Sequence, residues 1–191
     1  MATYLEQVQW KLRPANLIDN EALGPPLPVS EVAFTMQEVG KAIRQLKSGK
    51  AAGPDDIPAE YWKAISQTPG GLKWVTELCN TTWAAHKIPE AWRHATVSTI
   101  YNNKGPIHMC ENYRPISLLC VAYKLLAGLL LQRLQQAGAE DRLIQTQCGF
   151  RRGRGTTDAV HAVRRHIELA HARKDGGTTF LALDWKKLLI P

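Results

Sequence analysis

The chain has 191 residues, 45% hydrophobic and 21% charged, so it is long and apolar enough for a folded core and is not an intrinsically disordered protein. Its net charge is +7, and the whole excess lies in residues 101–191, which carry fourteen Lys and Arg against seven Asp and Glu, while residues 1–100 carry ten of each. This one-sided surplus favours a polyanionic partner, nucleic acid before membrane, although a solvated basic face without a partner explains it equally well.

The cysteines and the apolar stretches indicate a soluble, intracellular protein. The four cysteines are scattered and form no C-x-x-C pair, which is typical of reduced thiols. His108 and Cys110 could begin a zinc site, but no second close pair completes it. The N-terminus lacks a basic-then-apolar signal pattern, and the most apolar stretch, from Val121, is short and interrupted by Lys124 and Arg133.

The first part of the chain predicts an extended segment followed by a capped helix. Residues 1–33 contain the proline-rich run LGPPLPVS and are expected to form an extended lead-in. Thr35 and Glu38 have the spacing of a capping box, so a helix is predicted to begin there and to end at Gly49.

A loop rich in Gly, Pro and Asp, GKAAGPDDIP, comes next. It does not match G-x-x-x-x-G-K-[ST], so a nucleotide hydrolase of the P-loop type is excluded. A short helix is predicted over residues 58–65, and a longer one from the break at 68–71 through Lys87. Four tryptophans in these helical parts are expected in or near the core: Trp62, Trp74, Trp83 and Trp92.

The second half alternates strands and helices. ATVSTIY (95–101) and YRPISLL (113–119) are rich in β-branched or apolar residues and predict a β-hairpin. A largely buried helix is predicted over 121–135, another helix begins at 157–158, and TTFLALD (178–184) is expected to be a strand. The order of elements predicts an α+β fold and not a doubly wound sheet.

Asp184 stands at the end of that predicted strand. A carboxylate held there is well placed to bind a hard cation such as Mg²⁺. Enzymes that transfer phosphoryl groups often use two divalent metals, which need several carboxylates. The residues alone leave open whether Asp184 is a metal ligand or a surface residue at a strand end.

Three strings carry a resemblance to a known family: LKSGKAAGPDDIPAEYW, ENYRPISLL and QCGFRRGRGTTDAV, followed by the apolar run that ends in Asp184. In this order they resemble the reverse transcriptases of non-LTR (LINE-type) retrotransposons, over about Phe34 to Lys187. The resemblance implies the fingers and the start of the palm of a right-hand polymerase, a partial reverse transcriptase domain over 34–191 after the lead-in of 1–33.

The resemblance also implies roles for particular residues. Lys104 and Arg114, which flank the fingers hairpin, would clamp the triphosphate of the incoming dNTP. Arg151, Arg152 and Arg154 would contact the template or its backbone, with glycines between them that allow close approach. A basic, mobile loop before a helix is the alternative reading, and it applies above all to Arg152.

In this family Asp184 would be the first catalytic residue and a Mg²⁺ ligand, acting on an RNA template and a DNA primer, and the family implies a nuclear location. The chain departs from the family after LDWKK, where Leu188 and Leu189 replace Ala-Phe, and no Asp-Asp pair follows. The one such pair, Asp55-Asp56, lies upstream. With most of the palm and the thumb missing, we expect no polymerase activity from these 191 residues alone.

Three other hypotheses remain at this point. The chain could be a non-catalytic RNA- or DNA-binding module derived from a reverse transcriptase. A group II intron reverse transcriptase is a close neighbour of the LINE type, and YRPISLL favours the latter. A helical interaction protein unrelated to polymerases would leave the ordered motifs unexplained.

Overall fold

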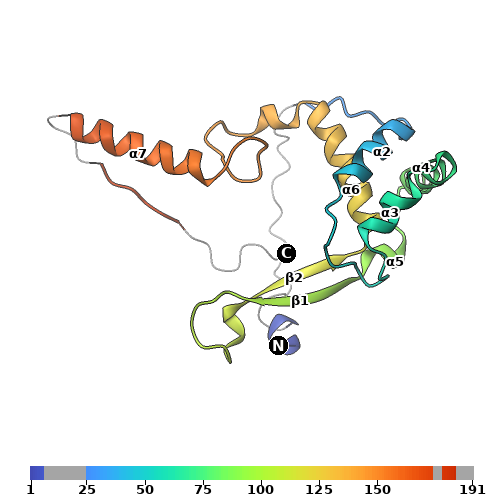
Figure 1. Cartoon of the computed structure of the whole chain (residues 1–191). Helices are drawn as coiled ribbons and strands as arrows, with labels where there is room; N and C mark the ends of the chain where they lie inside the picture. Colours follow the sequence, from blue (N-terminus) through green and yellow to red (C-terminus); the bar gives the residue numbers. More distant parts are fainter. Residues whose placement is uncertain (7–24, 174–177, 184–191) are drawn as a thin grey trace. The chain divides into compact units, whose positions relative to one another are not determined.

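The computed structural model describes residues 1–6, 25–173 and 178–183. The chain divides into two compact units, Leu27–Ala137 and Met1–Pro26 with Gly138–Pro191, of which the structure describes only the residues given above. In chain order the elements are α1 (Ala2–Tyr4), α2 (Met36–Gln45), α3 (Ala59–Ile65), α4 (Pro69–Ala84), α5 (Glu90–Arg93), β1 (Ala95–Tyr101), η2 (Cys110–Asn112), β2 (Tyr113–Leu119), α6 (Val121–Gln136), η3 (Ala139–Arg142) and α7 (Thr156–Ala172) (Figure 1).

The core of the unit 27–137 lies between α2, α3, α4 and α6, which are gathered beside one another in Figure 1. Three of these helices each bury a pair of residues four positions apart, which lie on one face of a helix. These fully buried pairs are Val39 and Ile43, Val75 and Cys79, and Leu125 and Leu129. Burial raises the pKa of the Cys79 thiol to about 12, so this cysteine is an inert core residue.

The predicted capping box at the start of α2 is confirmed. The Thr35 hydroxyl accepts a hydrogen bond from the Glu38 N–H at 3.2 Å, and the Thr35 N–H donates to the Glu38 carboxylate at 2.8 Å. The predicted end at Gly49 is wrong, because the last helical residue is Gln45. Gly49 instead takes a left-handed φ of 66° in the following turn, and its N–H donates to the Glu60 carboxylate at the start of α3.

Arg133 ties the segment before α2 to α6. Its side chain is only 2% exposed, and its guanidinium donates to both carboxylate oxygens of Glu38, at 3.0 and 3.3 Å. The remaining N–H groups donate to the backbone carbonyls of three residues in the lead-in: Ser30, Val32 and Ala33. The Phe34 ring lies 4.1 Å from the guanidinium carbon, in cation–π geometry. A buried charge is tolerated here because every donor has an acceptor.

Two sequence predictions are corrected by the exposure of apolar side chains. Trp74 is 49% exposed and stacks on the outer side of the core residue Trp62, with ring centroids 6.3 Å apart. The run 178–183 forms no strand, and its large apolar side chains, Leu181 at 81% exposed among them, are in solvent. A strand needs a neighbour for its backbone hydrogen bonds, and β1 and β2 pair only with each other in the described part of the chain.

The fold class is mixed α and β, as predicted, with one two-stranded antiparallel sheet in the described residues. The helices predicted at 58–65, 121–135 and 157 onward are confirmed within one or two residues at their predicted ends, as α3, α6 and α7. The longer helix, α4, starts at the predicted break and ends at Ala84, three residues before the predicted Lys87.

We predict that Arg133→Ala lowers the free energy of unfolding by about 3–5 kcal/mol, because it removes one member of a buried ion pair and strands three carbonyl groups. Urea unfolding followed by circular dichroism measures this loss. Arg93→Ala, which removes an exposed ion pair with Glu90, is the matched control and should cost less than about 1 kcal/mol. Equal losses for the two variants would contradict a central role for Arg133.

Stability should also depend on the ionisation of Glu38. The Arg133 hydrogen bonds, more than those from Thr35, hold the pKa of the Glu38 carboxyl below its ordinary value. Because the folded-state pKa is lowered, this contribution is present above the ordinary pKa and is lost as the pH falls through the lowered pKa. Glu38→Gln should therefore flatten the fall in stability below about pH 5, seen in urea midpoints, while Glu77→Gln should not.

Candidate nucleotide and nucleic-acid interface

The β-hairpin forms with the strand boundaries that its sequence predicts. β1 and β2 are antiparallel, with Tyr101 opposite Tyr113 next to the loop and Ile100 opposite Arg114 one step further in. The β-branched residues of β1 suit the pleated backbone. The hairpin therefore carries Arg114 on one of its faces, close to the loop 102–112.

The two tyrosines hold the loop of the hairpin in one conformation. Their rings lie 5.4 Å apart, the Tyr101 hydroxyl donates to the Gly105 carbonyl, and the Tyr113 hydroxyl donates to the Ile107 carbonyl at 2.9 Å. Both hydroxyls thus reach over the loop from the last pair of the strands. Lys104 lies in the segment that they fix.

Backbone geometry makes the loop tight as well as fixed. Asn103 and Gly105 take left-handed φ values of 56° and 75°, which Asn and Gly adopt more easily than other residues. A side chain at position 105 would also come within 2.6 Å of the Asn112 amide nitrogen. The Asn112 amide itself donates to the Pro106 carbonyl at 2.8 Å, which closes the loop from its far end.

Lys104 and Arg114 are both exposed, and neither side chain makes a hydrogen bond or an ion pair with any residue in the described part of the chain. Arg114 stands on the same face as two exposed isoleucines, Ile100 at 56% and Ile116 at 40%. The Tyr101–Tyr113 pair brings both cations near the loop end of one hairpin. Two cations without protein partners on one rigid element can bind a polyanion without first breaking other contacts.

The root of the hairpin is held by the upstream Gly/Pro/Asp loop. Gly53 is buried, and a Cβ there would lie 2.3 Å from the Cys120 backbone nitrogen, where β2 ends and α6 begins. The Cys120 thiol lies 3.8 and 3.7 Å from the carbonyl oxygens of Ala91 and Trp92 in α5. Only glycine allows the loop backbone to approach this junction so closely. The sequence predicted a loop here and gave no indication of this contact.

The three arginines of the run GFRRGRG lie in the other unit and differ from one another. Arg151 donates to the Ile144 and Glu140 carbonyls at 3.3 and 3.5 Å, and Arg154 donates to the Gln145 carbonyl at 2.8 Å. Both therefore help to shape the loop before α7. Arg152 is exposed, and its side chain has no hydrogen bond or ion pair with another described residue. Of the three, Arg152 is the one whose guanidinium makes no hydrogen bond within the described residues, so all its donors are available to a ligand.

Asp184 lies outside the described residues. Among the residues that the structure describes, no group of three or more His, Cys, Asp or Glu side chains converges on one point. Mg²⁺ requires several oxygen ligands in a regular arrangement, so the described residues do not fit this ion.

Comparison with known proteins decides the family. The family described as "Reverse transcriptase (RNA-dependent DNA polymerase)" matches residues 101–188, which contain the loop of the hairpin and all of β2. The chain is 29% identical over 150 residues to "Probable RNA-directed DNA polymerase from transposon BS" of Drosophila melanogaster, which covers 78% of this chain and 16% of that protein. The chain belongs to the reverse transcriptases of non-LTR retrotransposons.

Two further relatives place the chain as a segment of this kind of reverse transcriptase. It is 28% identical over 178 residues to "Retrovirus-related Pol polyprotein from type-1 retrotransposable element R1" of Bradysia coprophila, covering 89% of this chain and 17% of the relative. Identity to "RNA-directed DNA polymerase from mobile element jockey" of Drosophila melanogaster is 29% over 138 residues, or 72% of this chain and 15% of the relative. The chain thus spans less than a fifth of each reverse transcriptase relative.

None of the helices in the described residues is both long and apolar enough to cross a bilayer. The residues that sequence reasoning missed are the tyrosine pair and Gly53, which hold the hairpin in place. Tyr101 and Tyr113 stand at the two ends of an eleven-residue loop, and this local pattern could have indicated the tyrosine pair. The contact of Gly53 could not be found in this way, because its partner Cys120 lies 67 positions away along the chain.

We predict that Gly53→Ala destabilises this reverse transcriptase segment by about 1–3 kcal/mol, because the new methyl group must displace the backbone at Cys120. Thermal unfolding measures the effect. Gly70→Ala is the matched control, since a Cβ at position 70 meets nothing within 4 Å and Ala favours a helix. A Gly53→Ala variant as stable as the control would mean that the loop does not hold the root of the hairpin.

Proposed function

We propose that the β1–β2 hairpin acts in the fingers of a right-hand polymerase and grips the triphosphate of an incoming deoxynucleoside triphosphate. The observation that carries this proposal is the pair of exposed cations without protein partners, Lys104 and Arg114, at the loop end of a hairpin fixed by two tyrosines. The family match over 101–188 supports it, because it contains the whole loop and all of β2.

The two cations suit different parts of a triphosphate. The Arg114 guanidinium is planar and can donate two parallel hydrogen bonds to one phosphate group. The Lys104 ammonium is a compact charge on a flexible stem, so it can follow a second phosphate group. Because the tyrosine hydroxyls already fix the loop, binding would order little more than these two side chains, which lowers the entropic cost of association.

In this proposal the template is RNA and the primer is DNA. Two of the relatives are named as RNA-directed DNA polymerases, which supports the choice of template. Asp184 is proposed as a catalytic carboxylate and one ligand of Mg²⁺, which would stabilise the charge that develops on the phosphates. A single carboxylate cannot hold two metal ions, so the remaining ligands would come from outside these 191 residues. The partial polymerase domain is proposed to cover 34–191, after the lead-in of 1–33.

We propose that the arginine run contacts the phosphate backbone of the template mainly through Arg152. Arg151 and Arg154 already donate to carbonyls of their own loop, so their first contribution is to shape the backbone that presents Arg152. The flanking Gly153, with a left-handed φ of 71°, leaves room for a phosphate to approach. Such contacts would position the template without reading its sequence.

A non-catalytic nucleic-acid-binding module is the second candidate. The charge distribution favours it, because the entire net charge of +7 lies in residues 101–191. Binding to a nucleic-acid backbone weakens steeply with salt, whereas the grip on one triphosphate depends on a few particular side chains. The two functions therefore differ in which variants abolish binding and in how far salt weakens it.

We predict that a fluorescent N-methylanthraniloyl dATP binds the chain, and that Lys104→Ala and Arg114→Ala each weaken binding about tenfold, because each removes charge-assisted hydrogen bonds. Fluorescence titration at fixed ionic strength measures the dissociation constants. Lys41→Ala, an exposed lysine on α2, is the matched control and should bind as the unmodified chain does.

Two results would contradict the proposed grip. One is equal affinity in the Arg114→Ala variant and in the Lys41→Ala control. The other is nucleotide binding lost to the same extent in Arg152→Ala, which would indicate general attraction to a basic chain. If only single-stranded RNA binds, with affinity falling by orders of magnitude between low and moderate salt, the nucleic-acid-binding module is the better account.

A further inference from the structure

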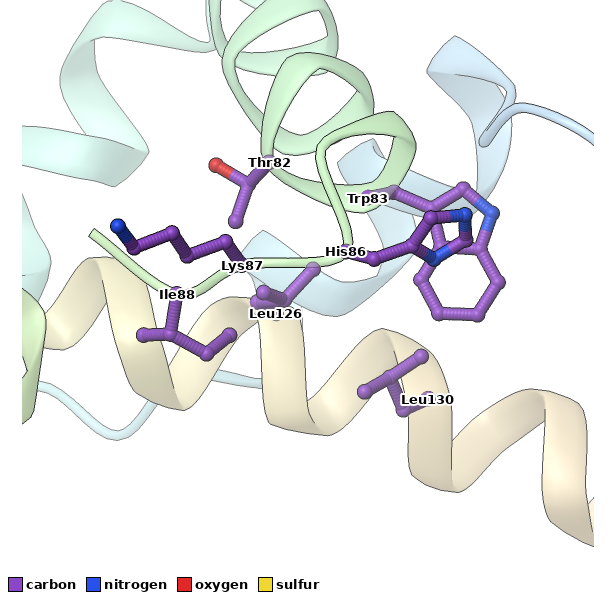
Figure 2. Close-up of a pocket in the computed structure, with 7 residues that line it drawn as sticks. All are labelled: Thr82, Trp83, His86, Lys87, Ile88, Leu126 and Leu130. Atoms are coloured by element: carbon purple, nitrogen blue, oxygen red, sulfur yellow. The ribbon is translucent and has the colours of Figure 1, made fainter.

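An apolar pocket lies between the C-terminal end of α4 and the middle of α6, within the unit 27–137 and apart from the hairpin loop. Leu126 and Leu130 of α6 form one side of it, and Thr82 and Ile88 form part of the other. Figure 2 shows Leu126 in the middle of the pocket, between Lys87 on one side and His86 on the other. Neither the triphosphate grip nor the arginine run uses any of these residues.

The wall formed by Trp83 is held in place before any ligand arrives. Its indole N–H donates to the Glu31 carbonyl at 3.0 Å, and its ring lies 5.6 Å from that of the buried Phe34. His86, just after the end of α4, forms the adjacent wall. It takes a left-handed φ of 49°, which turns the chain toward α6. The pocket is therefore a preformed feature with few parts that must move on binding.

Size decides what can enter. The pocket has a volume of about 240 Å³, which is below the range of about 300–1,000 Å³ usual for cofactors and drug-sized ligands. It is open to solvent and mostly apolar. These properties suit one large apolar side chain from a partner, held against Trp83 and Leu130, and not a nucleotide.

The charge at the rim indicates what should stand next to that side chain. The side chain of Lys87 is exposed and makes no ion pair or hydrogen bond with a described residue. No acidic side chain lines the pocket. A carboxylate of a partner would meet an unpaired ammonium at the edge of an apolar pocket, whereas a basic partner would be repelled.

We propose that this pocket docks an acidic peptide segment of a partner protein, which inserts one leucine or phenylalanine side chain and places a carboxylate against Lys87. The apolar surface continues along α6 to Leu134, which lies one turn beyond Leu130 and is 41% exposed. A second apolar residue of the peptide can pack against Leu134. Large apolar side chains in pockets provide most of the energy at such interfaces, and rim charges select the partner. This surface is independent of the triphosphate grip.

The test uses the full 191-residue chain and a fluorescein-labelled peptide with the core Glu-Glu-Leu-Leu-Glu-Glu. We expect saturable fluorescence polarisation that is abolished when both leucines of the peptide are replaced by alanine or all its glutamates by lysine. Lys87→Glu should weaken binding by about fivefold or more, since an attractive pair becomes a repulsive one. Lys41→Glu reverses another exposed charge, one that does not line the pocket, and should leave binding unchanged.

A second variant keeps the test independent of surface charge. Leu134→Gln changes an exposed position of α6 and should also weaken binding of the peptide. An unchanged midpoint of thermal unfolding would show that the fold of this variant is intact. The proposal is overturned if the acidic peptide shows no binding at millimolar concentration, or if Lys87→Glu and Lys41→Glu bind it equally. It is also overturned if single-stranded RNA displaces the peptide, because the surface would then serve nucleic acid.

Discussion

The Arg133 guanidinium is the point at which three parts of the fold meet. Arg133 lies near the end of α6. From there its guanidinium donates to the Glu38 carboxylate that caps α2 and to three carbonyls of the segment before that helix. A charge so deeply buried is stable only when all its donors are satisfied, so the lead-in, α2 and α6 must be in place together. The core helices thus form a rigid base for what projects from them.

The hairpin is held at both of its ends, and one of these ends is its junction with the core helices. β2 runs directly into α6 at Cys120, and the backbone of Gly53 packs against the same junction. At the far end, the tyrosine pair holds the loop by its own hydroxyl groups. A hairpin of two strands is marginal in isolation, and these contacts at both ends supply the order that a larger sheet would otherwise give. The cations on it are therefore presented on a defined surface.

Sequence reasoning predicted the local features well and the long-range contacts poorly. The strands 95–101 and 113–119, the capping box and the buried helix 121–136 follow from residue type and spacing, which act over a few positions. Arg133 was noticed only as an interruption of an apolar stretch, because its partners lie about 100 residues away. The run 178–183 has the composition of a strand, yet composition does not supply the neighbouring strand that it needs. Assignment to the family came from several short motifs in order, and the grip itself remains a proposal.

The central claim is that the tyrosine-held hairpin, and not basic charge in general, recognises a triphosphate. Titrating dATP into the ¹⁵N-labelled chain and following the amide signals by NMR tests it most directly. The account predicts saturable shifts in the loop 103–105 and at Arg114, with the signals of 151–155 unmoved at the same concentrations. Shifts confined to 151–155, or spread evenly over the basic residues, would contradict it.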